Sequence, residues 1–319
     1  MAGVLDQLGK EAHVAIVRLR SLGDCVLTTP AIQLLKRYRP DLRIGVVVEP
    51  RFAGIFEDNP DIDETLPPKM KALRRFHPQL AINLHGGTRS IFLTLGSGAR
   101  YRAGFGHYRY AFAHNVIIPT AQRVLQVERK VHTAEHLASA MFYLGVQPVE
   151  IPRARLFALP ARFPSPYAVI HALASQPGKA WPAERFLEVG AYLQSHCNLD
   201  PVFIGGPGED LKAYRKFRTL NAPLRETMST LAGASLFVGN DSGPAHMAAA
   251  FGIPLVVLFA TSDPVVWAPW KARAETIVAQ GGMSSVPSIQ VIGAVDRVRE
   301  INAEPSTYLA IGRPDLSVS

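Results

Sequence analysis

Cysteine is scarce in this chain, which contains only Cys25 and Cys197. Two cysteines cannot build a disulfide framework, and their separation matches no metal-ligand spacing. Long hydrophobic runs are also absent, because no apolar stretch approaches the roughly 18–20 residues needed to cross a bilayer. The N-terminal segment carries Asp6, Lys10 and Glu11, so it lacks the apolar core of a secretion signal. We therefore expect a cytosolic (cytoplasmic) protein with reduced thiols.

Several nucleotide- and metal-binding patterns are missing too. The chain has no Walker-type glycine–lysine motif, and its first turn, RSLGD at residues 20–24, lacks the three-glycine dinucleotide fingerprint. This argues against a nicotinamide-dependent oxidoreductase. Asp61 and Asp63 resemble a metal-holding acidic pair, but they stand in a polar, proline-bounded loop, and we expect plain solvent exposure there. No metal and no cofactor are predicted.

What the chain does contain is enough apolar material for two domains. Its 319 residues are 48% hydrophobic and 19% charged, typical of a globular protein with two domains of ~150 residues. The net charge of +8 lies in the first half: residues 1–160 hold 21 Lys+Arg and 13 Asp+Glu, whereas residues 161–319 hold 13 of each. Solvated helix faces explain any single basic cluster. The asymmetry as a whole suggests an anionic partner, such as nucleic acid, an acidic membrane surface or a phosphorylated glycolipid.

The first half alternates strand and helix patterns. Residues 13–19 and 43–49 are short apolar runs rich in β-branched residues, typical of buried strands, and residues 80–85 form a later one. Residues 26–38 show helical spacing between the first two strands. Pro30 is compatible with the first turn of that helix but not with its middle. The alternation predicts a parallel sheet covered by helices on both faces.

The second half repeats the scheme after residues 159–166, which hold three prolines in eight residues and predict a stiff, extended linker. Two Rossmann-like, doubly wound α/β domains are therefore expected, at residues 1–160 and 161–319, facing each other across a cleft. In the second half, strands are predicted at residues 167–171, 202–206, 236–239 and 255–259, and helices at 182–194, about 209–219 and about 243–251.

The strongest local signal is GNDSGPAH at residues 239–246, between a buried strand and an apolar helix. Asp241 or Ser242 can cap that helix, and the glycine lets a ligand approach the backbone closely. The N–H groups and dipole at a helix start attract an anion, and His246 could add a donor. A well-capped helix with a packed histidine would explain the same residues. The position outside the carboxyl end of a strand favours a phosphate site.

Three further residues follow strands in the same way. Lys179 precedes a proline-opened helix, where it could neutralise a diphosphate or be an ordinary exposed lysine. Glu209 follows a glycine-rich turn and could accept hydrogen bonds from a ribose or a base, although the glycines could serve the turn alone. Asp24, in the first strand–helix turn, could be only an N-cap. If it faces a bound sugar across the cleft, it is suited to act as a general base.

Together these stretches resemble glycosyltransferase family 9, whose best-known members are the ADP-heptose:lipopolysaccharide heptosyltransferases. The matching segments are residues 20–24 with residues 29–31, residues 179–186 and, most specifically, residues 237–246 with the alanine-rich helix that follows. Their order and separation span roughly residues 14–265. The chain departs from the family pattern at Ala172-Leu173, where proline–glycine is common, and it matches poorly after about residue 270.

The resemblance implies a GT-B architecture in which the first domain binds the acceptor and the second binds the nucleotide sugar. It implies an inverting, metal-independent glycosyltransferase that moves a heptose from ADP-heptose to an anionic lipopolysaccharide inner-core acceptor. The enzyme would make peripheral contact with the cytoplasmic face of the inner membrane and bind no nucleic acid. Asp24 matches the catalytic base and Lys179 the lysine near the donor phosphates. The donor-binding residues implied are Ser175, Lys179, Glu209, Asp241, Ser242, Gly243 and His246.

Two other functions stay open on the sequence. A family member could use another nucleotide sugar for O-antigen or a related glycan. A catalytically silent protein that binds polyanions would also explain the basic first half.

Overall fold

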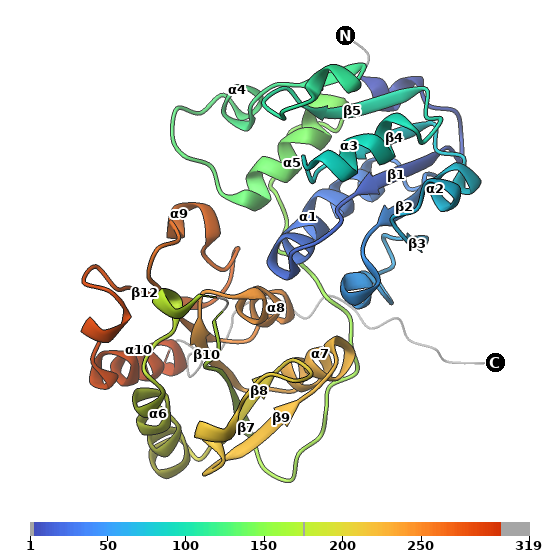
Figure 1. Ribbon diagram of the computed structural model, residues 1–319. Helices are drawn as coiled ribbons and strands as arrows, with labels where there is room; N and C mark the ends of the chain where they lie inside the picture. Colours follow the sequence, from blue (N-terminus) through green and yellow to red (C-terminus); the bar gives the residue numbers. More distant parts are fainter. Residues whose placement is uncertain (1–2, 175, 301–319) are drawn as a thin grey trace, which may run out of the picture.

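The computed structural model describes residues 3–174 and 176–300 and contains two six-stranded sheets flanked by helices (Figure 1). Every strand pair recorded in the two sheets is parallel. The first sheet uses strands between residues 13 and 118, and the second uses strands between residues 167 and 278. The predicted α/β fold with two Rossmann-like halves is therefore confirmed.

The first sheet is covered on both faces because its strands are apolar on both sides. In β1 (His13–Val17), Val14 and Ile16 lie in a core with α1 (Leu22–Tyr38) and α5 (Thr133–Leu144), whereas Ala15 and Val17 lie in a second core with α2 (Met70–Phe76) and α3 (Thr88–Leu95). The remaining elements are η1 (Val4–Gln7), β2 (Arg43–Val47), η2 (Pro50–Ile55), β3 (Glu64–Leu66), β4 (Leu80–Asn83), β5 (Tyr101–Phe105), η3 (Ala111–Ala113), β6 (Val116–Ile118) and α4 (Ala121–Leu125).

Both sheets share one strand order, which determines where a ligand can bind. The first runs β3-β2-β1-β4-β5-β6 and the second runs β9-β8-β7-β10-β11-β12. In such sheets the order reverses beside the first strand, and ligands bind at the carboxyl ends of the strands at that point. The elements of the second half are β7 (Tyr167–His171), η4 (Pro177–Lys179), α6 (Ala183–His196), β8 (Asp200–Gly205), η5 (Lys212–Tyr214), β9 (Arg218–Asn221), α7 (Leu224–Ala232), β10 (Leu236–Asn240), α8 (Gly243–Phe251), β11 (Leu255–Phe259), α9 (Pro264–Trp267), β12 (Ala274–Val278), η6 (Met283–Ser285) and α10 (Ser288–Glu300).

Helix α1 corrects the expectation about Pro30. The helix begins at Leu22 rather than at residue 26, so Pro30 lies in its middle. Proline has no N–H to donate to the carbonyl four residues earlier, which here belongs to Val26. The Thr29 hydroxyl supplies the missing donor, because its Oγ1 lies 2.8 Å from the Val26 carbonyl oxygen. The neighbouring threonine therefore lets the helix continue through the proline.

One other expectation about the second half was wrong. The helix predicted at residues 209–219 is the short 3-10 turn η5 followed by the edge strand β9. Its apolar residues, Leu211, Tyr214 and Phe217, recur every three residues and pack on the second core. This is the period of a 3-10 turn rather than an α-helix. Beyond residue 270, where a poor match to the family was expected, β12 and α10 complete the sheet and cover it.

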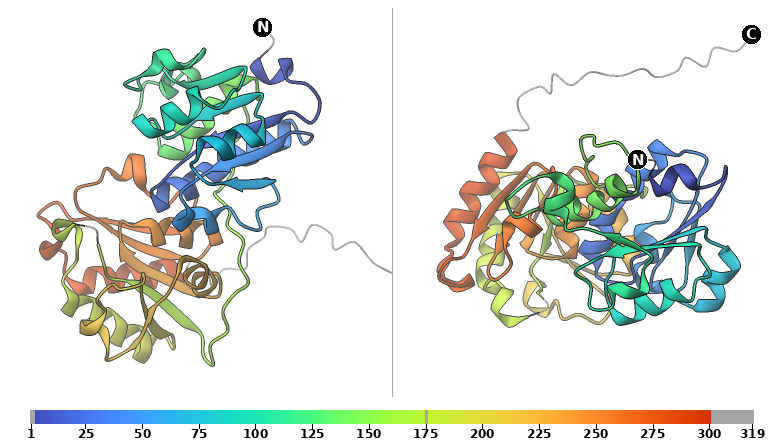
Figure 2. Two further views of the ribbon diagram at one scale, coloured as in Figure 1. Left: turned by 45° about the vertical axis from the view of Figure 1, so that its right-hand side comes forward. Right: turned by 90° about the horizontal axis from the view of Figure 1, so that it is seen from above.

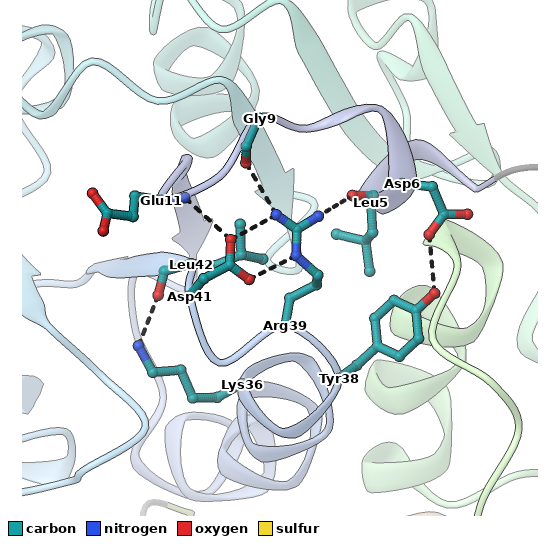
Figure 3. Close-up of polar contacts among 9 residues, drawn as sticks. All are labelled: Leu5, Asp6, Gly9, Glu11, Lys36, Tyr38, Arg39, Asp41 and Leu42. Carbon is teal, nitrogen blue, oxygen red and sulfur yellow. Dashed lines mark hydrogen bonds and ion pairs between the residues drawn. The ribbon is translucent and has the colours of Figure 1, made fainter.

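Part of the basic excess in the first half is used internally. Arg39 clamps the N-terminal segment at the end of α1: its guanidinium donates to Asp41 at 2.7 Å and to the carbonyl oxygens of Leu5 and Gly9 at 2.6 and 3.0 Å (Figure 3). The Arg39 guanidinium holds the pKa of the Asp41 carboxyl well below its usual range. Lys36 likewise donates to the Leu42 carbonyl oxygen (Figure 3). These cations stabilise the fold and are not fully available to an anionic partner.

The acidic pair at residues 61 and 63 is not simply solvent-exposed, which corrects that expectation. The Asp61 side chain is only 15% exposed and pairs with Arg155 at 2.8 Å. Asp63 accepts hydrogen bonds from the Lys36 ammonium at 3.0 Å and from the Ile44 backbone N–H at 2.7 Å. Asp61 therefore forms an ion pair with Arg155, and Asp63 forms one with Lys36.

The two halves are joined by a connection longer than predicted. After α5, no helix or strand forms until β7, and this segment runs along one side of both lobes (Figures 1 and 2). Its first part is packed rather than free, because Ile151, Ala154 and Leu156 are buried and the Arg155 N–H donates to the Thr29 hydroxyl. Residues from both halves share one hydrophobic core, in which α1 packs on α8.

Candidate active site

The predicted phosphate loop lies at the carboxyl end of β10, beside the point where the second sheet reverses its strand order. Asn240 is fully buried: its side-chain oxygen accepts from the Trp181 N–H at 3.2 Å, and its side-chain nitrogen donates to the Ala172 carbonyl oxygen at 3.0 Å. It therefore ties the loop to the segment that follows β7. Sequence reasoning assigned Asn240 no role, although a polar residue at the end of an apolar strand was a signal.

Lys179 and Asp241, both predicted to bind the donor, lie together. The Lys179 ammonium is 3.6 Å from the Asp241 carboxylate and donates to the Ser262 hydroxyl at 2.6 Å. Their side chains are only 23% and 14% exposed, respectively. A diphosphate arriving here would meet a lysine that is held in place by two neighbours. Ser262 was missed by the sequence analysis.

Ser242 and Gly243 form the start of α8. Ser242 is the N-cap residue, but its hydroxyl makes no capping bond and instead lies 3.1 Å from His171 Nδ1. His171 is buried, and the loss of hydration lowers its pKa to about 4. The imidazole is therefore neutral at neutral pH. His171 was not predicted as a site residue, although it ends the apolar strand β7.

A cavity of ≈ 410 Å³ opens at this edge of the second sheet. Glu209, Asp241, Ser242 and Gly243, four of the residues that the sequence analysis assigned to donor binding, line it. Glu209 is partly committed, because its Oε2 accepts from the Gly206 N–H at 2.6 Å. The cavity walls also include apolar residues of the second half. Three residues of the first half, which the sequence analysis did not indicate, complete the walls. These additional lining residues include Leu22, Arg51, Phe52, Leu173, Leu224 and Met247.

His246 does not line that cavity. It is 5% exposed and packs against the start of α1, where a Cβ atom on Gly23 would lie 2.6 Å from His246 Cδ2. Burial lowers its pKa to about 4, with Asp241 and Asp24 opposing that shift and His132 adding to it. Its Nδ1 has no hydrogen-bond partner. His246 therefore lies between the two predicted carboxylates as a neutral imidazole.

Asp24 lies in the first turn of α1 and lines a second cavity of ≈ 500 Å³. Its Oδ1 is 3.5 Å from Arg18 Nη1, and the two side chains are 20% and 7% exposed. The cavity also contains His85, His107, Tyr108 and His136, with Val266 and Trp267 from the second half. Burial lowers the pKa of His136 to about 4 and raises the pKa of Tyr108 to about 12, so both are uncharged at neutral pH.

Arg18 is the main residue that sequence reasoning missed. It follows the apolar run of β1, and only 6% of it is exposed. A charged residue at the end of a buried strand was a signal, because buried charges are retained when they are paired. Ser175, the remaining predicted donor residue, lies outside the described residues.

The first turn of α1, which carries Asp24, is in direct contact with the first turn of α8, which follows Asp241. Gly23 contacts His246, and a Cβ atom on Gly243 would lie 2.5 Å from Leu22 Cδ2. The helix that carries Asp24 and the helix that follows Asp241 therefore touch at their first turns, while Asp24 and Asp241 line different cavities. The described residues contain no helix long and apolar enough to span a bilayer. Nor do they contain a cluster of three His, Cys, Asp or Glu side chains that could hold a metal ion.

The two facing Rossmann-like lobes have the GT-B architecture. Residues 69–288 match the family model of glycosyltransferase family 9 (heptosyltransferase). The chain is 26% identical over 333 residues to lipopolysaccharide heptosyltransferase 3 of Escherichia coli, covering 88% of this chain and 97% of that protein. The chain belongs to glycosyltransferase family 9 and is an enzyme of glycosyl transfer.

Solved structures agree with this fold. A family 9 glycosyltransferase from Veillonella parvula has a TM-score of 0.78 at 22% identity, covering 91% of this chain and 97% of that one. The E. coli heptosyltransferase WaaC with ADP has a TM-score of 0.75 at 19% identity, covering 90% of this chain and 99% of that one. The GT-B architecture is thus common to all three proteins.

Proposed function

We propose that this enzyme transfers a heptose from ADP-heptose to an inner-core acceptor of lipopolysaccharide, with inversion at the anomeric carbon and without a metal ion. The observation that carries the proposal is the contact between the start of α1, which bears Asp24, and the start of α8, which follows Asp241. The names of the relatives supply the sugar and the acceptor class, and ADP in a similar structure supplies the nucleotide.

The reaction is a single in-line displacement. The acceptor hydroxyl attacks the anomeric carbon, its proton passes to Asp24, and a new carbon–oxygen bond forms. The bond from the anomeric carbon to the phosphate oxygen breaks, and ADP leaves with the electron pair. Attack from the face opposite the leaving group inverts the anomeric carbon.

Charge on the departing diphosphate is met by the Lys179 ammonium and by the dipole at the start of α8. Electrostatic help aimed at developing charge is often the largest catalytic contribution. With both in place, a metal is not required. His246 is neutral, so it can offer one N–H but no positive charge. The role expected for His246 from the sequence is therefore limited to donating one hydrogen bond.

The ≈ 410 Å³ cavity is the proposed nucleoside site, and Glu209 is its acidic residue. The Asp24 cavity is the proposed acceptor site, where Arg18 and the basic first half favour an anionic glycolipid. We propose residues 1–160 as the acceptor domain and residues 161–319 as the donor domain, with Leu22 and Phe52 of the first half closing the donor cavity. The acceptor would be met at the cytoplasmic face of the inner membrane.

Asp24→Asn tests the mechanism. Loss of the base should lower kcat for heptose transfer by about 10²–10⁴-fold, while ADP binding, measured by titration calorimetry, stays unchanged. Asp58→Asn is the matched control, because it makes the same chemical change at an exposed carboxylate and should leave kcat unaltered. Unchanged transfer by Asp24→Asn would remove the base assignment.

A donor panel separates the other functions. Thermal shift with ADP-heptose, nucleotide hexoses and NAD should show stabilisation by ADP-heptose above the others. Stabilisation by a nucleotide hexose alone would favour a related glycan. If no nucleotide sugar binds, a silent polyanion-binding protein becomes the better explanation. Full activity in EDTA and an inverted product by NMR are the expected results for metal independence and stereochemistry.

A further inference from the structure

One part of the first half carries basic residues without any acidic ones. Between Glu64 and Glu128, residues 65–127 include nine lysines and arginines and no aspartate or glutamate. This run contains α2, β4, α3, β5, the edge strand β6 and α4. Its charge cannot be neutralised locally in sequence, so a neutralising partner must come from elsewhere in the fold or from outside it.

Helices α2 and α3 cover the same face of the first sheet, and the end of α3 meets α2 (Figure 1). The Arg74 guanidinium donates to the Gly96 carbonyl oxygen at 2.8 Å, and Met70 packs against Gly96. Leu73, Phe76 and Leu93 point into the core beneath the two helices. The opposite sides of both helices therefore face outward on the same side of the sheet.

That outer surface combines exposed cations with exposed apolar side chains. Lys71, Arg74 and Arg75 are exposed on α2 and have no carboxylate partner among the described residues. Phe92 is 61% and Leu95 is 48% exposed on α3. We define these five residues as the α2–α3 surface. Large apolar side chains exposed beside cations are typical of a surface that binds a membrane or another molecule.

We propose that the α2–α3 surface binds an anionic lipid bilayer, with Phe92 and Leu95 entering the headgroup region and the cations contacting lipid phosphates. Charge complementarity supports a bilayer, because the inner leaflet is acidic and attracts clustered Lys and Arg. A lipid interface can bury the exposed side chains of Phe92 and Leu95. Binding to the phosphate backbone of a nucleic acid would not require apolar side chains. This rests on the proposed lipid-linked acceptor and identifies the surface that meets its membrane.

The surface is continuous with the proposed acceptor site. Gly87 is the N-cap of α3, and His85, two residues earlier, lines the Asp24 cavity. A helix of eight residues spans about 12 Å, so Leu95 lies roughly that far from the cavity rim. An acceptor whose lipid stays in the bilayer could therefore present its sugar to Asp24 without leaving the membrane.

Cosedimentation of the full chain with vesicles tests the proposal. Phosphatidylcholine vesicles containing phosphatidylglycerol should bind the protein, and pure phosphatidylcholine vesicles should not. Lys71→Glu with Arg75→Glu should weaken binding by about tenfold or more. Lys71 and Arg75 are like-charged residues at i, i+4 spacing on α2, and so are the two glutamates that replace them. Helix stability should therefore change little. Phe92→Ser with Leu95→Ser should weaken binding even to strongly anionic vesicles.

The matched control is Arg215→Glu with Lys216→Glu, which changes the net charge equally at exposed positions of the second half. It should bind vesicles like the wild type. Equal loss in this control, or undiminished binding by Lys71→Glu with Arg75→Glu, would overturn the proposal, as would preference of the wild type for duplex DNA over anionic vesicles. Because vesicle binding needs no donor or acceptor, its failure is distinguishable from failure of the proposed transfer reaction.

Discussion

At the scale of single residues, Arg18 explains how a carboxylate can be held in place beside a substrate cavity. Its guanidinium is nearly buried, its Nη1 is 3.5 Å from Asp24, and its Nε has no hydrogen-bond partner. Burying a cation is costly unless it is paired, and the carboxylate provides that pairing. Arg18 lines the Asp24 cavity and not the donor cavity, so we regard it as a residue that positions Asp24 on the acceptor side.

Arg18→Met should lower kcat by about 10–100-fold and leave the KM for the nucleotide sugar unchanged, because misplacing a reacting group mainly affects the chemical step. Arg18→Lys keeps the charge and should recover most of the activity. Steady-state kinetics with both substrates provide the measurement. A raised donor KM, or equal loss in the lysine variant, would indicate a packing role instead.

At the scale of elements, α1 depends on a side-chain substitute for one backbone hydrogen bond. Thr29 satisfies the Val26 carbonyl that Pro30 leaves without a donor, and its oxygen also accepts from the Arg155 N–H of the connecting segment. One hydroxyl therefore supports both the helix that carries Asp24 and the connection between the lobes.

Thr29→Val should reduce the free energy of unfolding by about 1–3 kcal/mol, because a buried carbonyl and a part-buried N–H both lose a partner. Thr29→Ser keeps the hydroxyl and should cost much less. Thr28→Val is the matched control: the Thr28 hydroxyl bonds the Asp24 carbonyl oxygen, which a backbone N–H of the helix also reaches. Urea unfolding measures all three, and equal effects at both threonines would contradict this account.

Patterning predicted the buried strands well because β-branched apolar runs have few alternatives inside a parallel sheet. It failed where side chains compensated for a local rule, as Thr29 does for Pro30. It also failed where spacing was ambiguous, as with Leu211 and Tyr214. Edge strand β9 pairs on one side only and carries little apolar signal, so residues 218–221 could not be identified from sequence alone.

For the candidate site, sequence reasoning found the residues that follow strands and missed those that hold them. Lys179 and Asp241 were expected to be near each other, and they are. Arg18, His171 and Ser262 were not expected, because their importance depends on distant partners in the folded chain. Long-range contacts of this kind leave no periodic pattern in a single sequence.

At the scale of the whole molecule, buried histidines couple stability to pH. Burial lowers the pKa of His171 and of His246 to about 4, below the value of about 6.5 in an unfolded chain. Above pH 6.5 both are neutral in either state, and their contribution is fully present. As the pH falls from 6.5 toward 4, the unfolded chain binds protons first, so stability is progressively lost.

The expected loss is on the order of 3 kcal/mol per histidine across that window. Urea unfolding above pH 7 and near pH 5 should show about 2 kcal/mol of this loss per histidine, and His171→Asn should reduce the difference. His196→Asn, at an exposed histidine, should leave the pH dependence unaltered. A free energy of unfolding that does not change over this range would mean that the buried imidazoles are hydrated or paired in solution.

The connection between the lobes provides a test of the proposed domain boundary. Arg162 lies in the exposed stretch after Pro160, and Leu159 is 87% exposed, whereas earlier parts of the connection are packed. Exposed connecting segments are preferred sites of proteolysis. Limited trypsin digestion should therefore cut first after Arg162, and Arg162→Gln should delay that cut.

The two fragments should nevertheless elute together in size-exclusion chromatography, because α1 packs on α8 within a core shared by both halves. Apolar burial of this kind does not depend on a continuous chain, so only a denaturant such as urea should separate the fragments. Separation under native conditions would show that the lobes are held together mainly by their covalent connection. In that case, closure of Asp24 against the donor loop would require a bound substrate.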